Sequence, residues 1–401
     1  MTARRQNAFN YLAAELISAA GAGISSVLFP LFLLAGGFKE DFLGLLASIG
    51  SGIAGLMSLP ASLVVARLGY RRSILIGMVT GVTVSFIQVL WPTSTCLIAT
   101  QVISGCFSSL SLVIHSPYLV ENAGEECGTR ILSLSMAGVT IIGTVFNIVG
   151  GWLPARLSAL TGLFHPDDFG AYRAGLLVAC LISSMSILPA VMLKEDLSHR
   201  VASRFRFGWA TYPWLTLAKV TVVSVSLGFG AGLFMPFMNV YWKTRFSLNT
   251  ELVGIISAAT AGAVGLGATL APVAERRLGL RKAIPILTGL SLFPMYGMIG
   301  SSSFRSAAWL FLTRTTLVNA TSPLRMNLTM EVVESEHRPL AASVESLAWS
   351  LAWAAGAAYG GRLILAAGYS LLFRLSVWVY AWATLAYPLC FGLYPPGGRV
   401  K

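Results

Sequence analysis

The chain consists of long apolar runs separated by short polar, mostly basic segments. Uncharged stretches cover residues 16–38, 42–66, 131–155, 220–242, 252–274 and 283–304, and residues 73–120 form a double-length run interrupted near Trp91-Pro92. A helix needs about 20 residues to cross the hydrocarbon core of a bilayer, so each run is long enough to span it. The runs are continuously apolar and do not alternate with polar residues, which favours helices over the strands of a membrane barrel.

This pattern predicts an all-α membrane protein with twelve transmembrane helices. The expected helices lie near residues 9–35, 42–66, 73–91, 95–120, 131–153, 172–193, 216–241, 251–274, 283–301, 306–330, 339–365 and 369–393.

A repeat divides these helices into two sets of six. Ala66-Arg67-Leu68-Gly69-Tyr70-Arg71-Arg72 recurs 210 residues later as Arg276-Arg277-Leu278-Gly279-Leu280-Arg281-Lys282, and Gly150-Gly151 recurs as Gly360-Gly361 at the same offset. Gly21-Ala22-Gly23 before Pro30 is echoed by Gly230-Ala231-Gly232 before Pro236. We therefore expect a first half at 1–194, a linker at 195–215 and a second half at 216–401. Tandem membrane halves are typical of transporters that bind substrate near the midplane.

Charge and composition narrow the class of protein further. Of 401 residues, 55% are hydrophobic and 11% charged, and the net charge is +12. Placing both termini and the linker in the cytoplasm puts 18 Lys and Arg residues inside and 7 outside, as the positive-inside rule requires. Topology thus explains the basic charge, and we expect no nucleic-acid partner. The five cysteines are scattered along the chain. The acidic residues of the outer loop at 154–172 are expected to be exposed to solvent. We therefore expect no metal or other cofactor.

The two basic loops resemble the loop signature G-x-x-x-D-R-x-G-R-R of the major facilitator superfamily. Arg67, Gly69, Arg71 and Arg72 match it, Ala66 replaces its Asp, and the second copy keeps Arg277, Gly279, Arg281 and Lys282. The resemblance implies that family's twelve-helix fold and transport by alternating access.

Acidic residues at the ends of the fourth and tenth helices are candidate gating partners of these loops. Glu331 and Arg338 resemble the E-x6-R element of sugar porters, whereas Glu121 and Arg130 in the first half have a different spacing. We expect Arg67 to reach Glu121 and Arg277 to reach Glu331, with ordinary interface pairing as the alternative. The gating set is Arg67, Gly69, Arg71, Glu121, Arg130, Arg277, Gly279, Arg281, Glu331 and Arg338.

Polar residues inside the apolar runs are the candidate substrate or coupling residues: Arg314, Glu15, Asn147, Asn319, Asn239 and His115. A charge at membrane depth is costly unless it is paired or hydrated. We therefore expect Arg314 to face the space between the halves. Glu15 is the candidate proton carrier or, alternatively, the partner of a loop arginine, and His115 is a candidate packing residue.

The sequence favours a monomeric secondary transporter that exports a small organic solute through the lipid bilayer, with protons as the candidate coupling ion. The segment Gly356–Gly361 resembles the G-P-x-x-G-G element of antiporters, although helix packing explains it equally well. An uptake symporter for sugars or organic anions is the alternative. An intramembrane transferase that uses His115 is a rival from another class, and we expect no enzyme activity. A membrane sensor without transport activity is a third.

Overall fold

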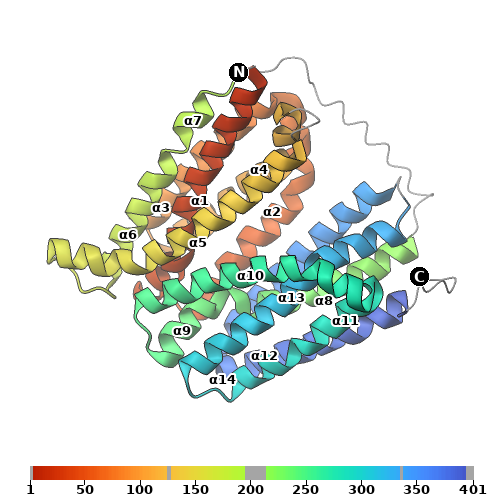
Figure 1. Cartoon of the computed structure of the whole chain (residues 1–401). Helices are drawn as coiled ribbons and strands as arrows, with labels where there is room; N and C mark the ends of the chain where they lie inside the picture. The colour runs from red at the N-terminus through yellow and green to blue at the C-terminus, as the bar shows by residue number, and fades with distance from the viewer. Residues whose placement is uncertain (1–2, 124–127, 195–213, 335–336, 394–401) are drawn as a thin grey trace. The chain divides into compact units, whose positions relative to one another are not determined.

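The computed structural model describes residues 3–123, 128–194, 214–334 and 337–393, and within these ranges it contains helices and no strand (Figure 1). The first six predicted spans are α1 (Ala3–Ala35), α2 (Glu40–Leu68), α3 (Tyr70–Leu90), α4 (Ser94–Ala123), α5 (Gly128–Thr161) and the pair α6 (Phe169–Ser184) and α7 (Ile187–Val191). The acidic first turn of α2 and its basic last turn complement the helix dipole.

The last six predicted spans follow along the chain. They are α8 (Trp214–Phe234) with η2 (Met235–Phe237) and α9 (Met238–Phe246), then α10 (Thr250–Leu278), α11 (Leu280–Leu290) with α12 (Leu292–Ile299), α13 (Phe304–Val332) and α14 (Arg338–Phe391). Pro236 and Pro294 lie at the breaks inside the first and third of these spans, because proline cannot donate the backbone hydrogen bond that continues a helix.

The prediction of twelve spans is confirmed. Ten helices of the described chain are long and apolar enough to cross a membrane. One of them lies within α14, where the backbone leaves helical geometry at Gly368 and so separates the two predicted spans. The twelfth is α13, which carries Arg314 and Arg325 and is correspondingly less apolar.

One boundary was predicted wrongly. The outer loop was expected to begin at Pro154, but α5 continues through this proline to Thr161. Proline inside a membrane helix is tolerated when the freed backbone groups find other partners. The predicted linker falls almost entirely on residues 195–213, which lie outside the described ranges.

The repeated loop glycines have one backbone conformation. Gly69 between α2 and α3 has φ 80° and ψ 165°, and Gly279 between α10 and α11 has φ 78° and ψ 151°. This region of backbone space is accessible essentially only to glycine. The sharp turn between consecutive helices therefore explains why the glycine is present in both copies of the loop.

The chain forms two compact units, each made of several segments. One comprises Met1–Lys39, Ile49–Phe205 and Ser247–Ala258, and the other comprises Glu40–Ser48, Arg206–Phe246 and Ala259–Lys401. The start of α2 thus belongs with the second unit and the start of α10 with the first. We describe each unit by itself.

Close helix packing repeats in the two units at the glycines of the sequence repeat. A side chain on Gly150 of α5 would lie 2.9 Å from the Cα of Ile24 on α1, and one on Gly360 of α14 would strike the carbonyl of Leu233 on α8. Gly356 likewise lies against the α8 backbone at Phe229. Helix packing is therefore sufficient to explain the glycine-rich segment Gly356–Gly361.

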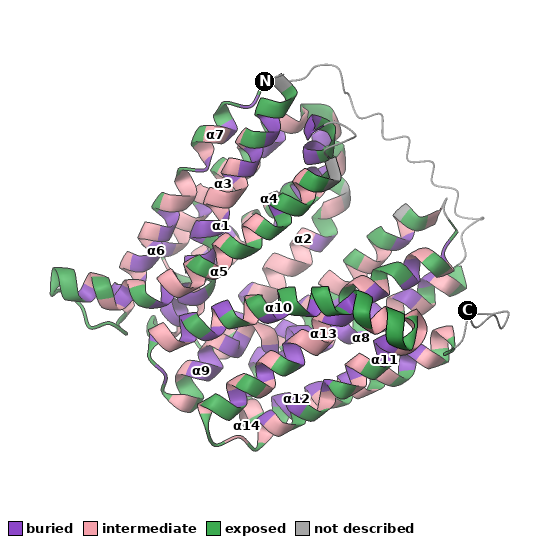
Figure 2. Cartoon of the chain, viewed as in Figure 1, coloured by how far each residue is buried: buried purple, intermediate pink, exposed green. Residues whose placement is uncertain are grey.

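Many large apolar side chains lie on the outer faces of the helices, where Figure 2 shows exposed residues along most elements. Leu160 is 82% exposed, and Phe293 and Leu389 are each 75% exposed. Exposed apolar side chains in this number are what a protein in contact with lipid requires.

Candidate functional site

The first candidate site joins three helices of the first unit around Glu15. Glu15 Oε1 on α1 lies 2.6 Å from His115 Nδ1 on α4, and the hydroxyl of Ser135 on α5 donates to Glu15 Oε2 at 2.8 Å. The side chains of Glu15 and His115 are 15% and 27% exposed. An acid and an imidazole in direct contact can share a proton.

Aromatic side chains cover this pair. The ring of Tyr11 lies 6.5 Å from the His115 ring and 5.0 Å from that of Tyr118, and Tyr118 packs edge-on against Tyr70. Tyr11 and Tyr118 are 3% and 4% exposed, within the apolar core of the unit. The Tyr118 hydroxyl has no hydrogen-bond partner. Glu15 and His115 are therefore largely shielded from water by apolar and aromatic groups.

The order of these contacts differs from that of a hydrolytic triad. A nucleophilic serine is activated by a hydrogen bond to the imidazole, which the carboxylate orients from its other side. Here the Ser135 hydroxyl donates to Glu15 and not to His115. The arrangement gives no support to an acyl- or glycan-transfer mechanism that uses His115.

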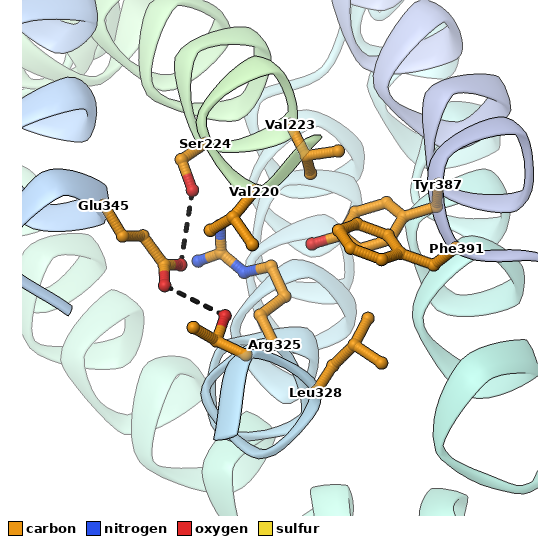
Figure 3. A pocket seen from close by; sticks show the side chains of 9 residues that line it. Val220, Val223, Ser224, Arg325, Leu328, Glu345, Tyr387 and Phe391 are labelled. Atoms are coloured by element: carbon orange, nitrogen blue, oxygen red, sulfur yellow. Dashed lines mark hydrogen bonds between the residues drawn. The ribbon is translucent and has the colours of Figure 1, made fainter. Parts of the chain in front are cut away.

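The second unit contains a cluster of similar chemistry (Figure 3). Glu345 on α14 accepts hydrogen bonds from Ser224 on α8, at 3.2 Å, and from Thr329 on α13, at 3.1 Å. With Arg325 and Tyr387 these residues line a cavity of about 10 Å³, about the volume that one water molecule needs. Arg325 Nε and Nη1 are buried and have no hydrogen-bond partner.

Arg314 lies deep inside the second unit and is 2% exposed. Its guanidinium carbon lies 4.7 Å from the ring centre of Phe234 on α8 and 4.6 Å from that of Tyr380 on α14. Its Nε and Nη2 have no hydrogen-bond partner. The sequence led us to expect an acid, a hydrated cavity or a substrate around this charge, whereas the structure surrounds it with two aromatic faces, which attract cations.

The three candidate asparagines are placed differently from one another. The amide of Asn147 on α5 lies 2.9 Å from the hydroxyl of Ser26 on α1, so that it ties two packed helices together. Asn319 donates to the carbonyl of Thr315 on its own helix at 2.9 Å. Asn239 is half-buried in α9. The hydrogen bonds of Asn147 and Asn319 lie outside the Glu15 and Glu345 clusters.

The gating carboxylates have partners other than those expected. Glu121 accepts a hydrogen bond from the hydroxyl of Tyr70 at 3.1 Å. Glu331 accepts from Arg281 Nη2 at 2.9 Å and from its Nε at 3.2 Å. The expected partners Arg67 and Arg277 are exposed. They lie in the last turn before the sharp loop, whereas Tyr70 and Arg281 lie in the first turn after it.

Arg71 and Arg281, which are equivalent in the repeat, also make equivalent backbone contacts. Arg71 Nη2 donates to the carbonyl of Val191 at 3.4 Å, and Arg281 Nη1 donates to that of Phe391 at 2.6 Å. Each carbonyl lies at the C-terminus of a helix, where cations are favoured. Arg338 Nε donates to the nearby carbonyl of Val333 at 3.3 Å, and Arg130 is exposed.

The carboxylate of Asp167 in the outer loop links side chains of two helices, α6 and α10. Asp167 Oδ1 accepts hydrogen bonds from the hydroxyls of Tyr172, at 3.1 Å, and Thr250, at 2.7 Å. Within the described ranges no group of three or more potential metal-ligating side chains was found.

Several residues of the two clusters were missed in the sequence. Ser135, Ser224 and Thr329 are small hydroxyl residues inside apolar runs, and they do not differ from the many serines and threonines that donate to their own helix. The repeat could have identified Ser135, because this residue lies 210 positions before Glu345, the same offset that relates the two basic loops.

The family model described as Major Facilitator Superfamily matches residues 11–318. Among solved structures, a mutant of the nucleoside transporter NupG matches with a TM-score of 0.77 and 15% identity, covering 96% of this chain and 100% of that one. A bacterial homologue of the human lysosomal transporter Spinster gives 0.73 and 12%, covering 97% and 98%. A D-xylose–proton symporter gives 0.72 and 16%, covering 96% of each chain. At such identities the likeness shows the fold alone. No curated protein matches this chain in sequence.

Proposed function

Because the chain belongs to the major facilitator superfamily, we propose that it moves a small organic solute across the membrane by alternating access, coupled to protons through Glu15 and His115. The observation that carries this proposal is the 2.6 Å contact between Glu15 Oε1 and His115 Nδ1 inside the first unit.

The physical reason is the balance of charge at membrane depth. With one shared proton the pair is neutral overall, and without it the pair carries one negative charge. A net charge in a poorly hydrated site is costly, so the pair retains one proton while it stays shielded. Hydration of the site lowers that cost and allows the proton to leave. A helix movement that alternately shields and hydrates Glu15 would therefore carry a proton through the cycle.

The proposed direction is export, in exchange for protons. It rests on the family resemblance of Gly356–Gly361 to an antiporter element, while the geometry of these glycines is explained by packing. The D-xylose–proton symporter shares the fold and is named for movement of solute and proton in the same direction, so the fold is compatible with either mode. Proton release on solute binding favours exchange, whereas proton uptake favours symport.

One observation favours an organic anion as the substrate. Arg314 is a 98% buried cation with two N–H groups left without a hydrogen-bond partner. Unpaired buried donors are costly, and a carboxylate or phosphate would satisfy both at once through a bidentate contact. An anion transporter that uses Arg314 is therefore the second candidate function.

The topology belongs to the same proposal. We place both termini and the linker in the cytoplasm on the basis of the 18 to 7 distribution of basic residues. A cysteine introduced into the linker of a cysteine-free variant should resist an impermeant thiol reagent applied to intact cells. Labelling of this cysteine from outside would show that the linker lies outside the cell and that the proposed topology is wrong.

The experiment that tests the function uses purified protein in liposomes that contain a pH-sensitive dye. Candidate solutes are first selected by thermal stabilisation from nucleosides, pentoses, dicarboxylates and lipophilic cations, since a ligand of the native state raises the melting temperature. The selected solute should then move protons across the wild-type liposomes and not across Glu15→Gln liposomes. Glu334→Gln, which removes an exposed carboxylate, is the matched control. Solute movement without proton movement in the wild type would refute coupling.

A further inference from the structure

The Glu345 cluster occupies the positions in the second half that correspond to the Glu15 cluster in the first. The glycines of α1 and α8 correspond at an offset of 209, and the basic loops and later glycines correspond at 210. Under these offsets the counterparts are Ser224 for Glu15, Arg325 for His115, and Glu345 for Ser135. Three helices of each half therefore contribute one cluster residue at the same place.

The hydrogen bond between the first and third of these positions is present in both halves, with its direction reversed. In the first half Ser135 donates to Glu15 at 2.8 Å, and in the second half Ser224 donates to Glu345 at 3.2 Å. The carboxylate lies on α1 in the first half and on α14 in the second, and the hydrogen bond between the two positions is present in both halves. The two clusters are thus structural counterparts as well as counterparts in sequence.

The second cluster differs from the first in how the carboxylate is held. Each oxygen of Glu345 accepts a hydroxyl hydrogen bond, from Ser224 on one side and from Thr329 on the other. Hydrogen bonds donated to a carboxylate favour its ionised form. In the first cluster one of the two oxygens lies against an imidazole instead, which can itself gain or lose a proton.

The basic member also differs, because Arg325 replaces the histidine. Arginine stays charged at all pH values that proteins tolerate. Figure 3 shows its guanidinium directed into the cavity beside Glu345 and Tyr387, while Arg325 also lies over the ring of Trp349 at 5.0 Å and donates to Ser322 at 3.3 Å.

A second charged pair, Arg281 on α11 with Glu331 on α13 at 2.9 Å, lies next to one lining residue of this cavity. Arg281 donates to the carbonyl of Phe391, and Phe391 lines the cavity. The cation that lines the cavity together with Glu345 is therefore Arg325, whereas the charge of Arg281 is offset by Glu331. The other ionisable side chain of the lining is Tyr387. An adjacent positive charge favours an ionised carboxylate.

We infer that Arg325 is a positioning residue that keeps Glu345 ionised throughout the transport cycle, so that the second cluster is a fixed-charge counterpart of the titratable Glu15–His115 pair. The description of the first cluster as the proton carrier rests on the proposed function, whereas the charge state of Glu345 does not. One repeat then exchanges protons, and the other keeps a carboxylate and a guanidinium charged beside one cavity.

Infrared difference spectroscopy of the purified protein between about pH 8 and pH 5 tests this inference, because a protonated carboxyl group has its own carbonyl band. The Glu345 contribution is identified by comparing the wild type with Glu345→Gln, or with Glu345→Asp, which moves the band, if the glutamine variant does not fold. We expect no contribution from Glu345 in the wild type. We expect one to appear in Arg325→Gln and to be suppressed again in Arg325→Lys, which restores the positive charge. The exposed Arg374 provides the control variant Arg374→Gln, which should behave as the wild type.

A Glu345 band in the wild-type difference spectrum would overturn the inference, as would its absence in a folded Arg325→Gln protein. The spectrum separates this result from the proposed function. If Glu15→Gln leaves the pH difference unchanged while Glu345 stays ionised, proton carriage by Glu15 fails and the fixed-charge role of Arg325 stands.

Discussion

Glu15 and His115 are 100 residues apart in sequence, and their Oε1 and Nδ1 atoms lie 2.6 Å apart. The contact joins α1 to α4, and the hydroxyl of Ser135 adds α5 to it. A carboxylate that could equally have paired with a loop arginine is thus held by an imidazole inside its own unit. The proposed proton coupling rests on this choice of partner.

The hydroxyls around this pair should differ in their effect on stability. Ser135→Ala removes a hydrogen bond to a carboxylate that is only 15% exposed, and hydrogen bonds to charged groups contribute about 1.5–3 kcal/mol. Tyr118→Phe removes a buried hydroxyl that has no partner and should leave the free energy of unfolding unchanged or slightly raised. Unfolding of both variants in mixed detergent and SDS micelles measures the difference. Equal losses in the two variants would show that the Ser135 bond does not stabilise the protein.

Arg314→Met should separate stability from function. A buried charge with two unpaired N–H groups is replaced by an apolar side chain of similar length, and such exchanges are often neutral or stabilising, by up to about 4 kcal/mol. We therefore expect an unchanged or higher melting temperature together with weaker binding of an anionic solute. Arg314→Lys should recover part of the binding if charge alone matters, and little if bidentate geometry matters.

Full transport of an anionic solute by Arg314→Met would remove this residue from the substrate site. Arg374→Met, at an exposed position of α14, is the matched control and should keep both wild-type stability and wild-type transport.

Arg281 and Arg277 should not be interchangeable. Arg281 binds Glu331 and the carbonyl of Phe391, so Arg281→Ala should lower the free energy of unfolding by about 1–2 kcal/mol, a value reduced by the partial exposure of Glu331. Arg277→Ala removes an exposed side chain and should cost less than about 0.5 kcal/mol. Chemical unfolding of the two variants in parallel checks the order. The reverse order would restore the pairing expected from sequence.

Gly69 should tolerate neither alanine nor asparagine. Its φ of 80° and ψ of 165° lie outside the left-handed helical region in which asparagine is tolerated, so both substitutions should cost about 1–3 kcal/mol. The melting temperatures of Gly69→Ala and Gly69→Asn provide the measurement. A clearly better asparagine variant would mean that the loop relaxes to left-handed geometry.

The sequence was sufficient to predict the helices, because a membrane span depends on the length and continuity of an apolar run. It placed Gly69 and Gly279 in equivalent loops through the repeat, and it selected Glu15, His115 and Arg314 through the cost of burying polar groups. It did not identify which side chains these residues contact. Glu331 binds Arg281, just after the sharp turn, and not Arg277, just before it, and the sequence does not show which of the two approaches α13.

The aromatic faces around Arg314 illustrate the same limit. Phe234 and Tyr380 lie 80 and 66 residues from it in sequence, and they are two of many aromatic residues in apolar runs. Helix rotation decides which rings meet the guanidinium, and an apolar run of this kind carries little information on rotation, as the weak amphipathicity of α8 and α13 shows.

The most direct test of the central claim is the number of protons exchanged when a solute binds. The purified protein is kept in weakly buffered solution at about pH 6.5, the ordinary pKa of a histidine side chain in a model peptide. It is mixed with the solute selected by thermal stabilisation, and a pH indicator reports the number of protons exchanged. We predict about one proton exchanged per solute bound by the wild type and none by Glu15→Gln, with release expected for an exporter that exchanges solute for protons. The same proton count in Glu15→Gln as in the wild type would contradict the assignment of Glu15 and His115 as the coupling pair.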